Sequence, residues 1–293
     1  MRFRPLAEAD IAMAAGWSDD LGLRVDRWRD AHTRSAVAVD AGDRVVAVGM
    51  MWTSRMHGNA YWLDVAVVPD RRREGLGTTM VHHLASLRHE NLPLKNRGFE
   101  GDVGLAFADA LGARTVQVVP PFTVSVSRRH SLSALGQHWR GSLVSASALS
   151  VQDVETANAE TYEWTHEHWS PVGPGFASAV NDGLWEDLNI EATVFALDEA
   201  GQIAASAMVY AEDERPLIVT ETTSREQQLG EAAVAACVHE ALSRLAARGV
   251  DEIDFDGHVS DPHFMPVLAR LSPTGRWFRL FELVPDEAIR RTV

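Results

Sequence analysis

Two stretches of the chain show the β-branched apolar runs and polar turn that are typical of a β-hairpin. In residues 35–52, two such runs flank the turn Asp40–Asp43. In residues 191–210, two similar runs flank the turn Glu199–Gly201. The same supersecondary pattern is therefore predicted twice in one chain.

Each predicted hairpin is followed by an apolar strand and then by an amphipathic helix. The first strand covers residues 60–68 and ends at Pro69, and the second covers residues 215–221. Apolar residues at helical spacing predict the helices, through Met80, Val81, Leu84 and Leu87 in the first case and Val234, Cys237, Val238, Ala241, Leu242 and Leu245 in the second.

The remaining segments complete two copies of one α/β unit. The first half begins with a strand at residues 2–5 and helices near residues 8–17 and 24–32, and it ends with a strand at 92–98, a helix at 103–111 and a strand at 114–126. The second half ends with a strand at 251–256, a helix at 263–271 and a strand at 275–284. We expect a fold of the α/β (α+β) class with two similar mixed-sheet domains, at residues 1–130 and 143–293, and a linker within residues 127–142.

The composition is that of a globular protein with full cores, since 46% of the 293 residues are hydrophobic. No apolar run reaches the ~18 residues that a membrane-spanning helix needs. The first ten residues have no apolar signal-peptide core, so we expect a cytoplasmic protein that does not act at a membrane. The single cysteine, Cys237, excludes an internal disulfide framework.

The charge differs strongly between the two halves. Residues 1–140 contain 18 Lys and Arg against 15 Asp and Glu, a net +3, whereas residues 141–293 contain 9 against 26, a net −17. An acidic half does not favour nucleic acid, because binding phosphates requires Lys and Arg. It favours a cationic small molecule, although an acidic surface is also an ordinary means of keeping a protein soluble.

The segment "VAVVPDRRREGLGTTM", residues 65–80, joins a strand to a helix through arginines and glycines. The first N–H groups of a helix have no intrahelical partner and lie at the positive end of the helix dipole, so they bind anions. Gly75 and Gly77 let the backbone approach a phosphate closely, and Arg72 and Arg73 add positive charge. The turn lacks the lysine of a P-loop and the third glycine of a dinucleotide-binding fingerprint.

The order Arg72-Arg73-Glu74-Gly75-Leu76-Gly77, with a strand and Val68-Pro69 before it and a helix after it, resembles the Arg/Gln-x-x-Gly-x-Gly/Ala signature of the GCN5-related N-acetyltransferase (GNAT) family. The resemblance implies a mixed sheet that opens between its fourth and fifth strands to admit acetyl-CoA. Because both halves have this plan, the chain resembles a tandem GNAT protein.

The resemblance also assigns residues to the acetyl-CoA site. The backbone of Val65, Ala66 and Val67 would pair with the pantetheine arm. The pyrophosphate would lie on the turn and the first residues of the helix, at Arg72, Arg73, Glu74, Gly75, Leu76, Gly77 and Thr78.

The second copy of the signature is degenerate. A shift of 153 residues places Leu229 and Gly230 on the first copy, but it replaces Gly75 by Gln228 and Arg73 by Glu226. A side chain and a negative charge at these places oppose an anionic ligand. We therefore expect acetyl-CoA only in the N-terminal domain, while the C-terminal domain is structural, forms a dimer or contributes to the acceptor site.

Acetyl transfer requires a general base to deprotonate the amine. By the resemblance, Asp64 on the fourth strand is the candidate, and an Asp facing solvent or capping a loop is the alternative; His89 and Glu90 are weaker candidates. The family's tyrosine near the end of the fourth helix, which protonates the departing thiolate, is missing, because Phe107 and Ala108 occupy that region.

Two further groups of residues are open to two interpretations. Trp17, Trp28, Asp19 and Asp20 form either an acceptor site or packing residues and helix caps. The segment 162–169, with its two histidines, is more typical of a helix end packed by tryptophans than of a metal site, and we expect no metal.

Two functions follow from these patterns. The first is an acetyl-CoA-dependent N-acetyltransferase for a small-molecule or peptide amine, for example a cationic one such as an amine-bearing antibiotic or another natural product. The second is a non-catalytic acyl-CoA-binding sensor or scaffold, which the missing tyrosine allows. A monomer and a homodimer both remain open.

Overall fold

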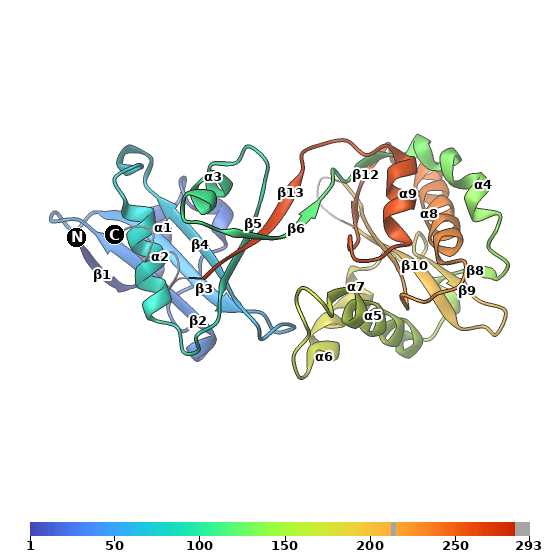
Figure 1. Cartoon of the computed structure of the whole chain (residues 1–293), viewed down its shortest axis with the longest axis horizontal. Helices are drawn as coiled ribbons and strands as arrows, with labels where there is room; N and C mark the ends of the chain where they lie inside the picture. The colour runs from blue at the N-terminus through green and yellow to red at the C-terminus, as the bar shows by residue number, and fades with distance from the viewer. Residues whose placement is uncertain (212–214, 285–293) are drawn as a thin grey trace. The chain divides into compact units, whose positions relative to one another are not determined.

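The computed structural model describes residues 1–211 and 215–284, and Figure 1 shows its elements. The chain forms two compact units. Unit 1 contains residues 1–117 together with the C-terminal segment from Arg279, and unit 2 contains residues 118–278. Each unit has a mixed sheet with helices packed on it.

Unit 1 has a seven-stranded sheet in the order β1-β2-β3-β4-β5-β13-β6. Its strands are β1 (Arg2–Pro5), β2 (Thr33–Val39), β3 (Val45–Thr53), β4 (Tyr61–Val67), β5 (Leu94–Phe99), β6 (Arg114–Val119) and β13 (Phe278–Leu283). Its helices are α1 (Glu8–Ala14), α2 (Leu76–Ser86) and α3 (Val103–Ala110), with short 3-10 turns η1 (Asp19–Leu21), η2 (Asp30–His32) and η3 (Pro69–Arg71). The predicted hairpin and the strand–helix pair are confirmed.

Residues 24–32 do not form the helix that we expected. They form turns and the short η2, with Arg27 and Asp30 at positive φ values of 61° and 49°. The carboxylate of Asp26 accepts hydrogen bonds from the backbone N–H of Ser35, at 2.9 Å, and from Arg34. These bonds tie the segment to the start of β2 and outweigh its local helical pattern.

The two faces of β4 are buried against different parts of unit 1. Tyr61 and Leu63 pack with α2 in one core cluster, and Val65 and Val67 flank that cluster. Ala66 flanks a second cluster on the opposite face, which includes Ala14 of α1. Because side chains alternate along a strand, Trp62 and Asp64 point to this α1 face.

Unit 2 has a six-stranded sheet in the order β7-β12-β11-β10-β9-β8. Its strands are β7 (Thr123–Ser125), β8 (Ser142–Ser145), β9 (Val194–Leu197), β10 (Ile203–Tyr210), β11 (Leu217–Thr222) and β12 (Glu252–Asp256). Its helices are α4 (Ser133–Gly136), α5 (Val151–His166), α6 (Phe176–Val180), α7 (Leu184–Asp187), α8 (Gly230–Ala247) and α9 (Phe264–Leu271), with 3-10 turns η4 (Val126–Leu132) and η5 (Ala146–Ala148). The main core lies around α8, which has eleven buried residues.

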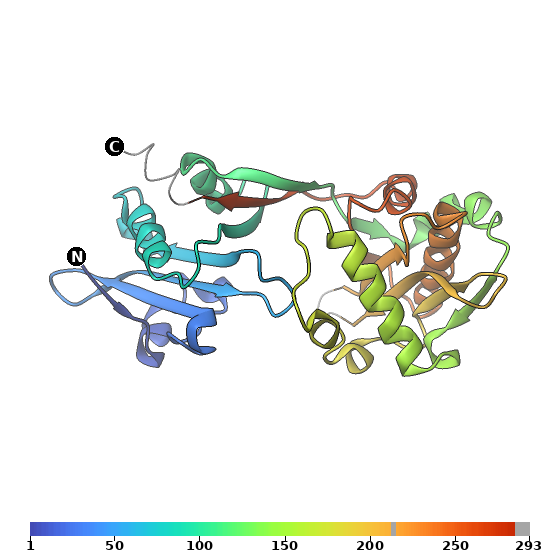
Figure 2. The same ribbon diagram turned by 60° about the horizontal axis from the view of Figure 1, so that its bottom comes forward.

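The boundary between the units differs from the one expected from the sequence. The predicted strand over residues 114–126 is split at Pro120-Pro121, so that β6 belongs to the sheet of unit 1 and β7 to that of unit 2. In return, β13 at the end of the chain enters the sheet of unit 1 between β5 and β6, and Figure 2 shows it in red beside the green β6. The two units thus exchange strands, which simple ranges such as 1–130 and 143–293 do not describe.

The expected linker is also part of a folded unit. Residues 126–136 form η4 and α4, and Leu132 is fully buried in the core around α8. The segment is rich in Ser, Arg and His, but its few apolar residues, such as Leu132, lie where they reach that core.

Candidate functional site

The strands β4 and β5 stop pairing shortly after they begin. They run in parallel, and along their described lengths their register contains two pairs, Tyr61–Leu94 and Trp62–Lys95. Beyond these pairs, Asn96 Nδ2 donates a hydrogen bond to the carbonyl of Leu63, where the next backbone bond of the ladder would otherwise form. The sheet therefore opens from Leu63 onward.

The backbone of β4 faces this opening at alternate residues. The N–H of Tyr61 donates to Pro93 O on the β5 side at 2.9 Å, whereas the N–H of Val68 donates to Val46 O on the β3 side at 3.0 Å. By alternation, the N–H and C=O groups of Val65 and Val67 lie on the β5 side. This arrangement offers an extended ligand a strand-like set of hydrogen-bonding groups, and Ala66 between them faces β3.

The turn after β4 ends on the exposed N-terminus of α2. Gly75 is the N-cap residue and has φ +80°, a left-handed conformation that favours glycine. Its carbonyl accepts the N–H of Thr79 at 3.0 Å, so the N–H groups of Leu76, Gly77 and Thr78 precede the first intrahelical bond. These groups form the anion-binding end of an eleven-residue helix.

Gly77 has a different role from the one expected. A Cβ atom on Gly77 would lie 3.1 Å from the ring of Phe107 on α3, whereas a Cβ on Gly75 would meet no atom within 4 Å. Gly77 is therefore needed for the close packing of α2 on Phe107, and Gly75 for its backbone conformation. The close approach of a phosphate to these glycines stays a prediction beside these two structural roles.

The charges of the turn are partly neutralised within it. Arg71 forms an ion pair of 2.7 Å with Glu74, which therefore points away from a pyrophosphate ligand. Arg72 donates from Nε to the carbonyl of Val67 at 3.1 Å, which fixes its side chain beside the end of β4. Arg73 is exposed and has a positive φ of 70°. Arg72 and Arg73 thus provide the positive charge next to α2.

Asp64 lies on the opposite face of the same strand. It is partly buried, opposite Met50 of β3, and its Oδ1 accepts a hydrogen bond of 3.1 Å from Asn96 Nδ2. Burial raises the pKa of Asp64, and the hydrogen bond from Asn96 and the charge of Arg97 reduce this rise. A buried carboxylate with a raised pKa at the opening of a sheet is suited to accept a proton.

Two residues at this place were not found from the sequence. Asn96 bonds to both Leu63 and Asp64, and the guanidinium of Arg97 lies 5.8 Å from the ring centroid of Trp62. The signal was present as three consecutive polar residues, Lys95-Asn96-Arg97, inside a short predicted strand. The role of these residues depends on β4, the strand that runs parallel to β5. The periodicity of one strand does not identify its neighbour in the sheet.

The weaker base candidates have structural roles. The backbone N–H groups of His89 and Glu90 donate to the hydroxyl of the buried Tyr61 at 3.2 and 3.3 Å, and their side chains are exposed. Asp19 accepts the N–H of Gly16 with both carboxylate oxygens at 2.8 Å, so it is a local cap.

The two tryptophans proposed for the acceptor site differ from each other. Trp17 is partly buried against both core clusters of unit 1, which favours packing. Trp28 is exposed, with the guanidinium groups of Arg24 and Arg29 at 5.4 and 5.8 Å from its ring centroid. Two cations on this ring do not favour a cationic acceptor there. The side chain of Asp20 lies outside the described part of the structure.

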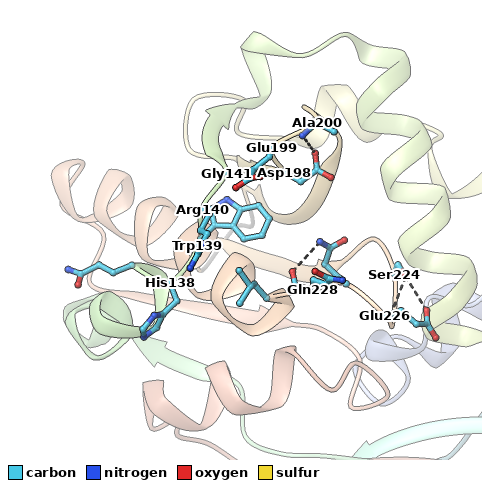
Figure 3. Close-up of a pocket in the computed structure, with 13 residues that line it drawn as sticks. His138, Trp139, Arg140, Gly141, Asp198, Glu199, Ala200, Ser224, Glu226 and Gln228 are labelled. Atoms are coloured by element: carbon cyan, nitrogen blue, oxygen red, sulfur yellow. Dashed lines mark hydrogen bonds between the residues drawn. The ribbon is translucent and has the colours of Figure 1, made fainter.

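In unit 2, the turn that corresponds to Arg72–Gly77 borders an open cavity of about 1030 Å³. Figure 3 shows its lining, which includes the carboxylates of Asp198, Glu199 and Glu226, and Glu226 is bonded to Ser224. The N-cap residue of α8 is Leu229, at φ 56°, so the helix begins one residue later in the signature than α2 does. The charge and the backbone of this turn both differ from those of unit 1.

The backbone at the end of β11 is bonded to side chains from distant segments of unit 2. The N–H of Thr222 donates to the fully buried Asp261 at 3.1 Å, and its carbonyl accepts the indole N–H of Trp164 at 2.9 Å. A Cβ atom on Gly230 would lie 2.7 Å from the ring of His263. The backbone N–H and C=O groups of Thr222 thus already have partners within unit 2.

A buried polar cluster follows on from Thr222. Glu221 accepts hydrogen bonds from the backbone N–H and from Nδ1 of His258, the latter at 2.6 Å. The Nε2 atoms of His258 and His166 are 3.0 Å apart, and His166 Nδ1 donates to the carbonyl of Tyr162 at 2.8 Å. Within the described residues, no group of three His, Cys, Asp or Glu side chains has the arrangement of a metal site. His166, the last residue of α5, thus belongs to a chain of hydrogen-bonded side chains. The sequence favours a packed helix end at this place.

The comparison with protein families supports the interpretation of the first unit. Residues 6–92, which extend from the end of β1 to the loop before β5, match the acetyltransferase (GNAT) family. A comparison with curated protein sequences found no match. No helix in the described part of the chain is long and apolar enough to cross a membrane.

Solved structures with a similar fold cover both units. A GCN5-related N-acetyltransferase from Sphaerobacter thermophilus matches with a TM-score of 0.56 at 14% identity, over 96% of this chain and 95% of that one. A tandem GNAT protein from the clavulanic acid biosynthesis pathway matches with a TM-score of 0.55 at 15% identity, over 96% and 98%. The N-myristoyltransferase of Saccharomyces cerevisiae, with bound myristoyl-CoA, matches with a TM-score of 0.53 at 8% identity, over 96% and 82%.

These similarities agree with the two sheets, the opening between β4 and β5, and the glycine turn before α2. The resemblance stated from the sequence is confirmed. Residues 6–92 match the GNAT acetyltransferase family, and the chain as a whole has the tandem GNAT fold.

Proposed function

We propose that the protein is an acetyl-CoA-dependent N-acetyltransferase whose reaction takes place in unit 1. The observation that carries this proposal is the arrangement about β4. The N-terminus of α2 lies at the end of this strand, and Asp64 points from the strand to the face opposite α2. An anionic acyl donor and an amine acceptor can thus approach one opening from two sides.

The residues of unit 1 have separate roles in binding the donor. Val65 and Val67 provide backbone groups for the pantetheine arm, and the N–H groups of Leu76, Gly77 and Thr78 hold the pyrophosphate. Arg72 and Arg73 add positive charge, while Ala66 and Glu74 shape the strand and the turn. This assignment follows the family signature at Arg72–Gly77.

The chemical step forms a bond between the amine nitrogen and the acetyl carbonyl carbon, and it breaks the carbon–sulfur bond of the thioester. The amine loses a proton to Asp64, and general base catalysis of this kind contributes about 10²- to 10⁴-fold to the rate. The sulfur leaves as a thiolate that takes its proton from water, because Phe107 on α3 has no proton to donate.

Unit 2 does not bind acetyl-CoA in this proposal. The backbone of Thr222, at the end of β11, is already bonded to Asp261 and Trp164, and Glu226 lies in the turn where a pyrophosphate would require positive charge. Unit 2 retains a structural role. The chain passes through unit 2 before it returns to the sheet of unit 1 as β13.

The first experiment is a calorimetric titration of the full chain with acetyl-CoA. We expect one site per chain, strongly weakened by Gly75→Gln, because a side chain is strained at φ +80° and would alter the backbone of the turn. Gly201→Gln is the matched control, since Gly201 also has φ +80° with no atom near a Cβ, and it should leave the titration unchanged. Two sites per chain would contradict the assignment to unit 1, and no binding would overturn the proposal.

The second experiment measures release of CoA thiol with a panel of primary amines. Asp64→Asn should retain acetyl-CoA binding and lose thiol release. Binding without thiol release from any amine would instead support a non-catalytic acyl-CoA sensor, which the replacement of the family's tyrosine by Phe107 specifically favours.

A further inference from the structure

Asp64 and Arg97 hold matching places on the two strands that diverge. Trp62 of β4 pairs with Lys95 of β5, so two residues further along each strand the register would place Asp64 opposite Arg97. Both residues follow the alternation of their strands to the α1 face. They therefore stand on either side of the opening, on the face from which the acceptor approaches.

The guanidinium of Arg97 lies against an aromatic ring and does not form an ion pair with a carboxylate of the described residues. Its guanidinium lies over the ring of Trp62 at 5.8 Å, and its backbone N–H donates to Asn96 Oδ1 at 2.6 Å. Within residues 1–211 and 215–284, its side chain forms no ion pair with a carboxylate, although it is close enough for its charge to lower the pKa of Asp64. A fixed, exposed and unneutralised guanidinium beside a catalytic carboxylate is a site for an anion.

We propose that Arg97 binds a carboxylate of the acceptor, so that the substrate is an amino acid or a similar amine that carries a carboxylate. This inference rests on the proposed function. The amine is directed to Asp64 on β4 while the carboxylate pairs with the fork of Arg97 on β5. Since paired strands lie ~4.8 Å apart and these two diverge, the space between the two groups suits a short amino acid.

The surroundings of the pair favour this class of acceptor over the cationic one that the charge of residues 141–293 suggested. Lys95 is also basic, and it is buried beside Trp62 on the same strand face. Trp52 of β3 pairs with Trp62, so two indole rings border the site and offer an apolar wall to the body of the acceptor. A polycation would meet the exposed Arg97 on this face and be repelled.

The test compares amino acids with the amines that lack their carboxylate, such as phenylalanine with 2-phenylethylamine and γ-aminobutyrate with propylamine. Thiol release is measured for the full-length protein and for Arg97→Gln. We expect the wild-type protein to prefer the carboxylate-bearing member of each pair. Arg97→Gln should raise KM for that member by roughly 10- to 100-fold, the range for a hydrogen-bonded charge, and leave the KM of the other member unchanged. Any change in kcat through the pKa of Asp64 should be the same for both members.

Two controls keep the result specific. Arg24→Gln removes a guanidinium that also lies over a tryptophan, at 5.4 Å from the ring of Trp28, and it should leave every KM unchanged. Arg97→Lys retains the charge without the planar fork and should restore part of the preference. The corresponding aminophosphonates distinguish a carboxylate site from a general oxyanion site, which would accept both.

The outcomes separate this inference from the proposed function. If both members of each pair are acetylated equally well, or if Arg97→Gln changes the KM of both members equally, the carboxylate site is overturned and the N-acetyltransferase stands. If no amine of either class gives thiol release, the proposed function fails and the inference fails with it.

Discussion

Asn96 of β5 donates one hydrogen bond to the side chain of Asp64, at 3.1 Å, and another to the backbone of Leu63 on β4. It stands where the two strands stop pairing, so a single amide both ends the ladder and orients the candidate base. The opening of the sheet and the position of its carboxylate are thus set by the same residue.

Replacement of Asn96 by Ala should shift the pH dependence of the reaction. The hydrogen bond from Asn96 lowers the pKa of Asp64, so its loss raises that pKa further and moves the acidic limb of kcat/KM to higher pH. At neutral pH we expect the rate to fall by about tenfold, since one charge-assisted hydrogen bond is lost. The pH profile distinguishes this from a general loss of structure, because misfolding would lower the rate without moving the limb.

Asp64→Asn should make the folded protein more stable at neutral pH. A carboxyl whose pKa is raised by burial binds its proton more tightly in the folded state, so the free energy of unfolding falls as pH rises from the unfolded pKa, about 3.9, through the folded one. The uncharged amide that replaces the carboxyl in the variant does not titrate, so this loss of stability does not occur. Its Oδ1 can still accept the hydrogen bond from Asn96.

Thermal unfolding at pH 5 and pH 7.5 checks this, with Asp70→Asn as the control. The pKa of the exposed Asp70 is lowered by its hydrogen bond to Arg44, so its replacement should not stabilise the protein. A lower melting temperature for Asp64→Asn at pH 7.5 would contradict the assignment of Asp64 as a buried, destabilising charge.

Gly77→Ala should destabilise unit 1 through Phe107. The new methyl group would lie 3.1 Å from the ring, and overpacking of this kind costs about 1–3 kcal/mol. Adding Phe107→Leu should recover part of the stability, which a double-mutant cycle on the free energy of unfolding measures. If the double variant is no more stable than Gly77→Ala, the contact with Phe107 is not the reason for this glycine.

The cluster of Glu221 and His258 should make the stability of unit 2 depend on pH. Burial alone would lower the pKa of His258, but the charge and hydrogen bond of Glu221 outweigh it, aided by Asp256 and Asp261, and raise the pKa. Burial also raises the pKa of Glu221, so the pair retains a proton in the folded state. The stabilisation is complete below the unfolded histidine pKa, near 6.5, and is lost as pH rises through the folded value.

Chemical denaturation between pH 6 and pH 9 should therefore show a falling free energy of unfolding. In Glu221→Gln, His258 loses the charge that holds its proton, and we expect the slope in this range to flatten. Glu167→Gln, an exposed carboxylate next to His166 in sequence, is the matched control and should keep the slope. An unchanged slope in Glu221→Gln would show that the proton resides elsewhere.

Removal of the last strand should unfold part of unit 1. A chain that ends at residue 277 lacks β13, which lies between β5 and β6, so both strands lose a neighbour. We expect loss of acetyl-CoA binding although every residue of the signature remains. A synthetic peptide of residues 278–293, added to the truncated chain, should restore binding; full binding without it would show that β5 and β6 do not need β13.

The pattern of residues along the chain determined the local elements and the kind of turn before α2. The hairpins, the amphipathic helices and the glycine–arginine signature depend on neighbouring residues, and periodicity and backbone freedom act at that range. Asp64 could be chosen for the same reason, since a charged residue in an apolar strand stands out without any tertiary information.

Only the tertiary structure decided which strands lie together and what each side chain meets. Asn96 acquires its role because β5 runs beside β4, Gly77 because α3 places Phe107 on it, and Thr222 is blocked because Asp261 and Trp164 come from distant segments. The exchange of β7 and β13 was hidden for the same reason. Hydrogen bonds between strands and contacts between helices join residues far apart in sequence, and no pattern within one segment records its partner.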